Sequence, residues 1–321
     1  MSVSVLAPGL SSSVQDLGRC GHAALGVGRA GALDGDALRL ANALVGNLPG
    51  AAGIEITLTG PRLRFDATVA FALCGADFEA RLDGAIVAGW RSHHAPAGSQ
   101  LELGHARSGC RAWLALGGGI ALPRMLDSRA TDLNAALGPL PRALRAGDVL
   151  PLDTLHDPPR ARRRRWSLDP RPWFAGADAA PLRVLPGRDH ARLDAASRSA
   201  FHAMPFRVTA TSNRVGVRLD GTPLRLEQAF ECVSEPLVPG VVQLPPGGQP
   251  IILLGEHPVS GGYPRIGQVA AVDLPRLAQV RPGTALRFAL VDAATAAALL
   301  HARRRARDQL EARIRARLEQ A

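Results

Sequence analysis

The chain has 321 residues, of which 46% are hydrophobic and 21% are charged, so we expect a soluble globular protein with room for two domains. All 38 basic residues are arginine, and the formal net charge is +10. Because the chain has no lysine, it cannot form a Walker A phosphate loop or a Schiff base, and it cannot carry covalently attached biotin.

The sequence shows no signal-peptide pattern and no apolar run near the roughly 18–20 residues that a membrane span requires. Its four cysteines are widely spaced, and two of them, Cys74 and Cys110, lie in apolar runs as reduced core thiols do. We therefore expect a cytoplasmic protein with no membrane partner.

Arginine is concentrated in two places, residues 160–165 and 303–317. The first run lies in a proline-rich stretch that is typical of a linker. In the second, Leu310, Ile314 and Leu318 stand four residues apart, which predicts a helix with one narrow apolar stripe. Since aromatic residues make up only 4% of the chain, a solvated or packing helix is favoured over a nucleic-acid surface.

In chain order, the first predicted element is a helix within residues 32–46, capped by Asp34 or Asp36 and ended by Gly46. Short apolar or alternating segments follow it, and Asp83-Gly84 is a strong hairpin signal. Their spacing predicts a mainly β fold with some α, as in a barrel or sandwich. The segments lie at residues 54–65, 68–75, 78–89 and 101–118.

A turn followed by a short strand recurs at residues 97–103, 146–152 and 282–288, which favours two related lobes. From this organisation we expect four regions. They are a first β-barrel lobe at 1–153, a proline- and arginine-rich linker at 154–181, a second β-barrel lobe at 182–291 and a helical tail at 292–321.

Three patterns are only weak indicators of a cofactor or a metal. Residues 26–31 read GVGRAG, but no buried strand precedes them and no repeated βαβ units follow, so a dinucleotide-binding fold is disfavoured. The glycines at 117–119 are better explained by a turn. His93 and His94 would point to opposite faces of a strand, and we expect no metal site.

The denser polar signals lie in the second lobe. Asn213 and Arg214 precede a glycine by two or three residues, as where a loop brings a guanidinium to an anionic ligand. Glu235 precedes an aliphatic run, and Glu256 and His257 follow another. A carboxylate, a histidine and an arginine in one small lobe could form an acid–base and anion-binding site.

Structural roles compete with this hypothesis for each residue. Glu235 would cap a turn, Arg214 would pair with Asp220, and His257 would be a hydrogen-bonding loop residue. These alternatives stay open at this point.

The loop at residues 255–264 continues a buried strand predicted at 251–254. Its glycines would let the backbone approach a ligand closely. We expect Tyr263, the only tyrosine of the chain, to lie on the pocket wall.

Several long phrases occur in one order between Val14 and Phe288, among them VQDLGRCGHAALGV, DSRATDLNAALG, SNRVGVRL, SEPLVPGVVQLPPGGQPIILL and PVSGGYPRIG. In these phrases the chain resembles the biotin-dependent carboxyltransferase A/B-domain family. That family is also called allophanate hydrolase subunit 2, and it includes KipA and the C subunit of 5-oxoprolinase. The resemblance implies two cyclophilin-like β-barrel subdomains.

The resemblance also implies partners and a reaction. The family usually works with a KipI-like chain, the B subunit of 5-oxoprolinase, and 5-oxoprolinase has an A subunit as well. That complex uses ATP with magnesium to open 5-oxo-L-proline to L-glutamate. Phosphorylation of the lactam oxygen would make it a leaving group before water attacks, which requires groups for phosphate oxygens and for proton transfer. By chemical type we assign Glu235, Glu256 and His257 to catalysis, and Arg29, Asn213, Arg214, Ser260, Gly261, Gly262 and Tyr263 to binding of substrate or phosphate.

Two other functions stay open. One is a KipA-like regulatory protein that binds a kinase inhibitor, and the other is a carboxyltransferase subunit that acts on a urea-like amide with biotin delivered by another protein.

The chain also departs from the family pattern. Asn213 stands where we expect Asp, and because an amide cannot act as a base it would keep only a hydrogen-bonding role. Val215 stands where we expect Met, and the trio at 256–258 differs from that of many members. The arginine-rich linker and the tail after Ala293 match nothing in the family.

Overall fold

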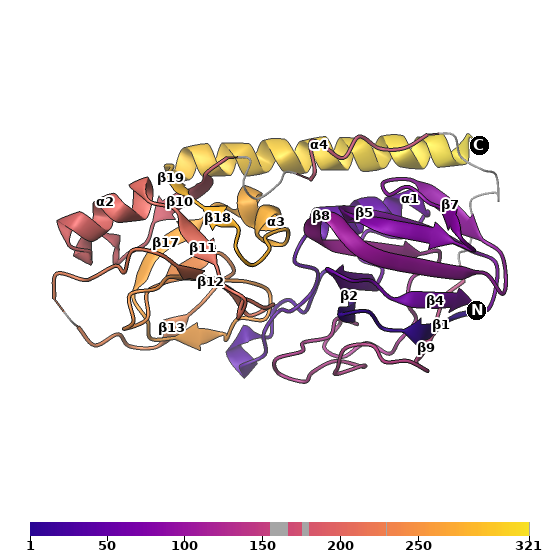
Figure 1. The fold of residues 1–321 in the computed structure, drawn as a ribbon, viewed down its shortest axis with the longest axis horizontal. Helices are drawn as coiled ribbons and strands as arrows, with labels where there is room; N and C mark the ends of the chain where they lie inside the picture. The colour runs from indigo at the N-terminus through magenta and orange to yellow at the C-terminus, as the bar shows by residue number, and fades with distance from the viewer. Residues whose placement is uncertain (155–165, 175–179, 229, 321) are drawn as a thin grey trace. The chain divides into compact units, whose positions relative to one another are not determined.

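A computed structural model describes residues 1–154, 166–174, 180–228 and 230–320, so the arginine run at 160–165 lies outside the described residues (Figure 1). Contacts divide the chain into two units. Each unit contains segments that are far apart in the sequence. The first unit comprises Met1–Arg19, Ala30–Ala175 and Arg305–Ala321, and the second comprises Cys20–Arg29 and Gly176–Arg304.

The first unit is built on a nine-stranded sheet with the strand order β2-β3-β8-β4-β1-β9, to which β5, β6 and β7 are attached through β8 and β5. The sheet curves into a nearly closed barrel. Its strands are β1 (Ser2–Ala7), β2 (Ser11–Gln15), β3 (Gly53–Thr57), β4 (Arg62–Phe65), β5 (Val69–Leu82), β6 (Ala85–Ile86), β7 (Ser92–Ala95), β8 (Gln100–Leu116) and β9 (Val149–Pro151).

The segment predicted at 68–75 and the first part of the one predicted at 78–89 form a single strand, β5, which pairs with β8 along most of its length. The pairing register shifts after Gly75, whose φ is 103°. A side chain there would place its Cβ 2.6 Å from the Arg111 carbonyl oxygen, so a glycine lets the strand bend and continue. The predicted turn is confirmed, because Asp83 and Gly84 have positive φ angles and join β5 to β6.

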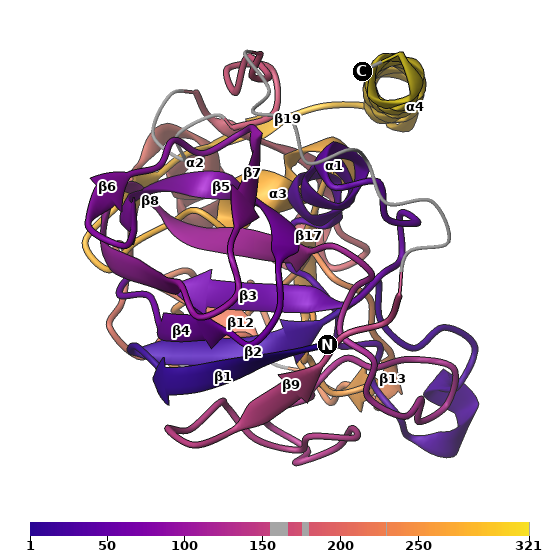
Figure 2. The same ribbon diagram turned by 90° about the vertical axis from the view of Figure 1, so that its right-hand side faces the viewer.

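Helix α1 (Gly35–Leu44) begins where the sequence predicts it. Of the two candidate caps, Asp34 is the one that accepts a hydrogen bond from the Ala37 backbone N–H, at 3.0 Å. The helix packs on β5 and β8 (Figure 2), and its Leu38, Leu40 and Leu44 side chains are fully buried. The 3-10 helix η1 (Ala23–Leu25) lies in the early segment that groups with the second unit.

The second unit contains an eight-stranded sheet that forms a half-barrel, with the order β18-β11-β12-β15-β14-β17-β10-β19, and a two-stranded ribbon of β13 and β16. Stacked Phe201 and Phe288 rings, 4.7 Å apart, lie in its core. The elements are β10 (Leu182–Pro186), η2 (His190–Arg192), α2 (Ala195–Ala203), β11 (Phe206–Val208), β12 (Gly216–Asp220), β13 (Glu235–Pro236), β14 (Val241–Gln243), β15 (Ile251–Leu253), β16 (Ser260–Gly261), β17 (Arg265–Val269), η3 (Ala271–Asp273), α3 (Leu274–Leu277), β18 (Ala285–Leu286) and β19 (Phe288–Leu290).

The predicted tail is a single helix, α4 (Ala293–Glu319). Its residues up to Arg304 group with the second unit, and those from Arg305 onward group with the first. The predicted fold class, mainly β with some α and a C-terminal helix, is therefore confirmed. Within the described ranges, no helix is both long enough and apolar enough to cross a membrane.

Candidate functional site

The first polar cluster continues the pairing of β12 with β15. Beyond the paired ends of these strands, the backbone N–H of Glu256 donates to the carbonyl oxygen of Arg214 at 3.0 Å. The Arg214 Nε then donates to the Glu256 Oε1 at 2.6 Å, and these side chains are only 7% and 2% exposed. The structure thus joins two predicted site residues in a buried ion pair, and it does not pair Arg214 with Asp220.

Asn213 shapes the turn that precedes this pair. Its side-chain Oδ1 accepts a hydrogen bond from the Val215 backbone N–H at 2.9 Å, and its own N–H donates to the Gly216 carbonyl oxygen at 3.1 Å. An Asx turn of this kind needs a side-chain oxygen and no proton transfer. The amide oxygen therefore shapes the turn that carries Arg214.

His257, the residue after Glu256, is also buried. Its Nδ1 lies 2.7 Å from the carbonyl oxygen of Pro258. Burial lowers the pKa of His257, although the hydrogen bond to Pro258 partly opposes the shift. Because a carbonyl oxygen only accepts, Nδ1 carries the proton of the neutral ring and Nε2 keeps its lone pair. None of the described residues hydrogen-bonds to Nε2, so this atom can accept a proton.

The second polar cluster surrounds Glu235 on the ribbon, where β13 pairs with β16 and Glu235 lies opposite Gly261. Its carboxylate contacts Arg188, and its Oε2 lies 3.1 Å from the Arg265 Nη2. The hydrogen bond from Arg188, more than any other contact, lowers the pKa of Glu235. Glu235 therefore stays ionised at neutral pH, which makes it a weak general base and suits it to holding two guanidiniums.

Sequence reasoning missed Arg188 and Arg265 as members of this cluster. Arg265 belongs to the phrase PVSGGYPRIG, and Arg188 follows a glycine in PGRD, but neither spacing indicates that both reach Glu235. The pairing of β10 with β17 brings Arg188 and Arg265 together.

The other predicted binding residues lie on or near the ribbon, except for Arg29. A Cβ on Gly261 would lie 2.9 Å from the Leu237 Cδ1, and one on Gly262 would lie 2.9 Å from the Cys232 carbonyl oxygen, so the two glycines permit close packing around the ribbon. Ser260 is exposed in β16, and Tyr263 is 47% exposed just after it. Arg29 is exposed in the early segment that groups with the second unit.

The donor set offers little for a metal ion. Within the part of the chain that the structure describes, no group of three or more His, Cys, Asp or Glu side chains is placed to hold one.

The part of the chain that carries both clusters matches a known family. The family model for the carboxyltransferase domain, subdomain A and B, matches residues 25–290, and the chain belongs to this family. The tail helix lies beyond the matched residues.

Individual proteins show the same relationship. The chain is 39% identical to the 5-oxoprolinase C subunit of Escherichia coli (strain K12), over 88% of this chain and 89% of that protein. It is 35% identical to the protein of the same name from Haemophilus influenzae, over 90% of this chain and 91% of that protein. The crystal structure of Kluyveromyces lactis urea carboxylase matches with a TM-score of 0.87 and 28% identity, over 96% of this chain and 29% of that one.

Proposed function

We propose that this chain is the C subunit of an ATP-dependent 5-oxoprolinase. It would be a non-autonomous part of the enzyme that opens 5-oxo-L-proline to L-glutamate, together with an A subunit and a KipI-like B subunit. The observation that carries the proposal is the 39% identity to the E. coli 5-oxoprolinase C subunit, which extends over 88% of this chain and 89% of that protein. Such a complex would act in the cytoplasm, with ATP and magnesium required by the complex as a whole.

The residues of this chain would contribute proton transfer and positioning. Nε2 of His257 is the atom suited to take a proton from attacking water, because the ring is neutral and Nδ1 is fixed by Pro258. The Arg214–Glu256 ion pair would hold the start of the same loop, since both side chains are buried and joined at 2.6 Å. ATP supplies the phosphoryl group that activates the lactam.

The test is glutamate formation from 5-oxo-L-proline and ATP by the chain mixed with its A and B subunits. We expect activity only in the full mixture, and we expect His257→Gln to lower kcat by about 100-fold or more, as loss of a general base does. His301→Gln, at an exposed histidine in α4, is the matched control and should leave kcat unchanged. A full mixture that assembles but forms no glutamate would contradict the proposal and favour a KipA-like regulatory role.

A second candidate function is carboxyl transfer to a urea-like amide. The observation that favours it is the match to K. lactis urea carboxylase, with a TM-score of 0.87 over 96% of this chain. Because the chain has no lysine, biotin would have to arrive on another protein. Transfer of a labelled carboxyl group from a biotinylated carrier to urea, in a mixture that makes no glutamate, would establish this alternative.

A further inference from the structure

Two arginines meet on one carboxylate in the second unit. Arg188 follows β10 and Arg265 begins β17, and both contact Glu235. The side chains of Arg188 and Glu235 are 48% and 36% exposed, whereas that of Arg265 is 20% exposed. The cluster can therefore be reached by a small molecule.

Backbone packing holds both arginines in place. Gly187 lies against β17 so closely that a Cβ there would be 2.2 Å from the Arg265 carbonyl oxygen. The backbone N–H of Asp189 donates to that same carbonyl oxygen at 3.0 Å, and the backbone N–H of Arg265 donates to the Asp189 Oδ2 at 2.9 Å. The turn that carries Arg188 is thus fixed to the strand that carries Arg265.

Buried Asp189 also orders the guanidiniums around it. Its carboxylate forms ion pairs with Arg188 at 3.4 Å and with Arg192 at 3.5 Å. The five residues, three arginines against Asp189 and Glu235, carry a net charge of +1 (+3 − 2). A fixed, partly exposed pair of guanidiniums with excess positive charge suits a planar oxyanion.

We propose that Arg188 and Arg265 bind the carboxylate of a small ligand, and that Glu235 occupies this position until the ligand displaces it. Glu235 is placed for such an exchange because it lies on a ribbon of only two paired residues per strand. The inference rests on the proposed function, in which the ligand is 5-oxo-L-proline, an amide ring that carries one carboxylate.

The test is a calorimetric titration of the isolated chain with each of three ligands. They are 5-oxo-L-proline, its neutral primary amide and inorganic phosphate. We expect the acid to bind and the amide to bind at least about tenfold more weakly, because a charge-assisted pair of hydrogen bonds is lost. Arg188→Gln and Arg265→Gln should each weaken binding of the acid about tenfold. Glu235→Gln should bind the acid at least as tightly as the unaltered chain, since both guanidiniums are then released.

Arg198→Gln is the matched control, because Arg198 is a partly exposed arginine of the same unit that pairs with Glu227 at 3.7 Å. Equal binding of acid and amide, or equal losses in the Arg188 and Arg198 variants, would overturn the inference. Tighter binding of phosphate than of the acid would overturn the assignment of a carboxylate. Arg188→Lys, which keeps the charge without the planar fork, covers the case in which the Gln variant does not fold, and its binding should also be weaker.

The binding assay and the glutamate assay can fail separately. An active complex that is insensitive to Arg188→Gln would refute this inference and leave the proposed function intact. An inactive complex whose isolated chain binds 5-oxo-L-proline through Arg188 would refute the enzymatic function and leave the binding site intact.

Discussion

Arg214 and Glu256 are each charged and almost fully buried, so their ion pair compensates part of the hydration that each has lost. Removing one partner takes this compensation from the buried charge of the other, whereas replacing both by apolar side chains removes both buried charges. The contribution of this pair to the stability of the protein can therefore be measured with single and double variants.

We predict that Glu256→Gln lowers the free energy of unfolding by about 3 kcal/mol, the usual effect of breaking a buried ion pair. The double variant Arg214→Met, Glu256→Leu should recover most of that loss. Urea unfolding followed by circular dichroism measures both. As a control, Glu227→Gln removes an exposed partner and should change stability by less than about 0.5 kcal/mol. A single-variant loss below about 1 kcal/mol would show that the pair is not buried in solution.

His257 should set the acid limb of the activity if it accepts the proton in the reaction. Burial lowers its pKa, so the ring stays neutral to a lower pH than an ordinary histidine, whose pKa is about 6.5. We predict that kcat of the reconstituted complex is constant above about pH 6.5 and falls only below that value. A pH–rate profile measures this, and an acid limb above about pH 7 would assign the proton transfer to another group.

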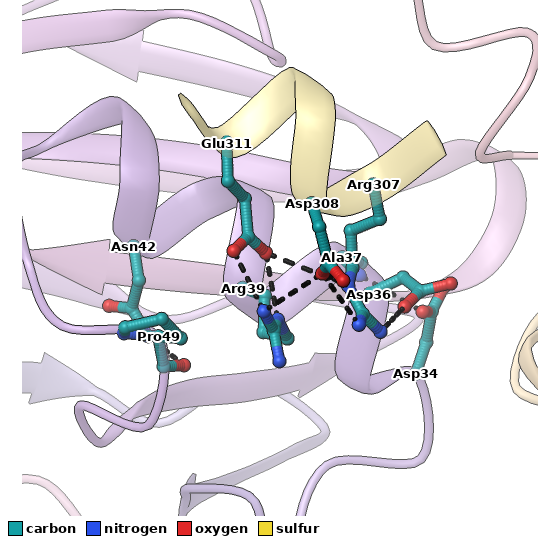
Figure 3. A network of polar contacts seen from close by, with 9 residues as sticks. All are labelled: Asp34, Asp36, Ala37, Arg39, Asn42, Pro49, Arg307, Asp308 and Glu311. Atoms are coloured by element: carbon teal, nitrogen blue, oxygen red, sulfur yellow. Dashed lines mark hydrogen bonds and ion pairs between the residues drawn. The ribbon is translucent and has the colours of Figure 1, made fainter. Parts of the chain in front are cut away.

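At the scale of elements, the second half of α4 is attached to α1 within the first unit (Figure 3). Arg39 makes two parallel hydrogen bonds to Glu311, both 2.7 Å long, and Arg307 donates to the Asp36 Oδ1 at 2.9 Å. Ile314 is 2% exposed on the same helix. Polar pairs thus join the two helices, and one buried aliphatic side chain lies in the same part of α4.

The buried aliphatic side chain should contribute more free energy to the attachment of α4 than the ion pairs do. Truncating a buried Ile to Ala costs about 2–5 kcal/mol, whereas a partly exposed ion pair contributes about 1 kcal/mol. We predict that Ile314→Ala lowers hydrogen-exchange protection of residues 305–319 far more than Arg39→Gln does. Raising the salt concentration should weaken the Arg39 effect only. Equal loss of protection in both variants would mean that the ion pairs carry the attachment.

Local sequence patterns predicted the elements that local interactions define. The capping oxygen of Asp34, the apolar face of α1 and the Asp83-Gly84 turn all act over a few residues, and all are confirmed. The sequence did not predict that β5 continues through Gly75, because that bend depends on how closely the backbone of β8 approaches.

For the whole molecule, the sequence did not predict which residues that are far apart in the chain contact one another. The motifs indicated Arg214, Glu235, Glu256 and His257, yet which residues pair could not be read from their spacing. Glu235 meets an arginine 47 positions earlier in the chain, and Arg214 meets a glutamate 42 positions later. Such pairings follow from strand order, which the sequence of one chain does not specify.

The two units also differ in where their tryptophans, their tyrosine and the histidines with a lowered pKa lie. All four tryptophans lie between Trp90 and Trp173, in the first unit, and the single tyrosine, Tyr263, lies in the second. His190, His202 and His257 all lie in the second unit, and burial lowers the pKa of each. His190 and His202 also contact one another, with their Nε2 atoms 3.1 Å apart.

This division predicts that mild acid destabilises the second unit first. A histidine with a lowered pKa binds protons more readily after unfolding, so its contribution to stability is complete above about pH 6.5 and is lost as the pH falls below that value. Carboxylates with lowered pKa, such as Asp273, contribute until the pH falls below about 4. Between about pH 6 and 4.5, hydrogen exchange should accelerate in peptides of the second unit while tryptophan fluorescence stays unchanged. His202→Asn should reduce this pH dependence, whereas simultaneous loss of both signals would mean that the two units unfold as one.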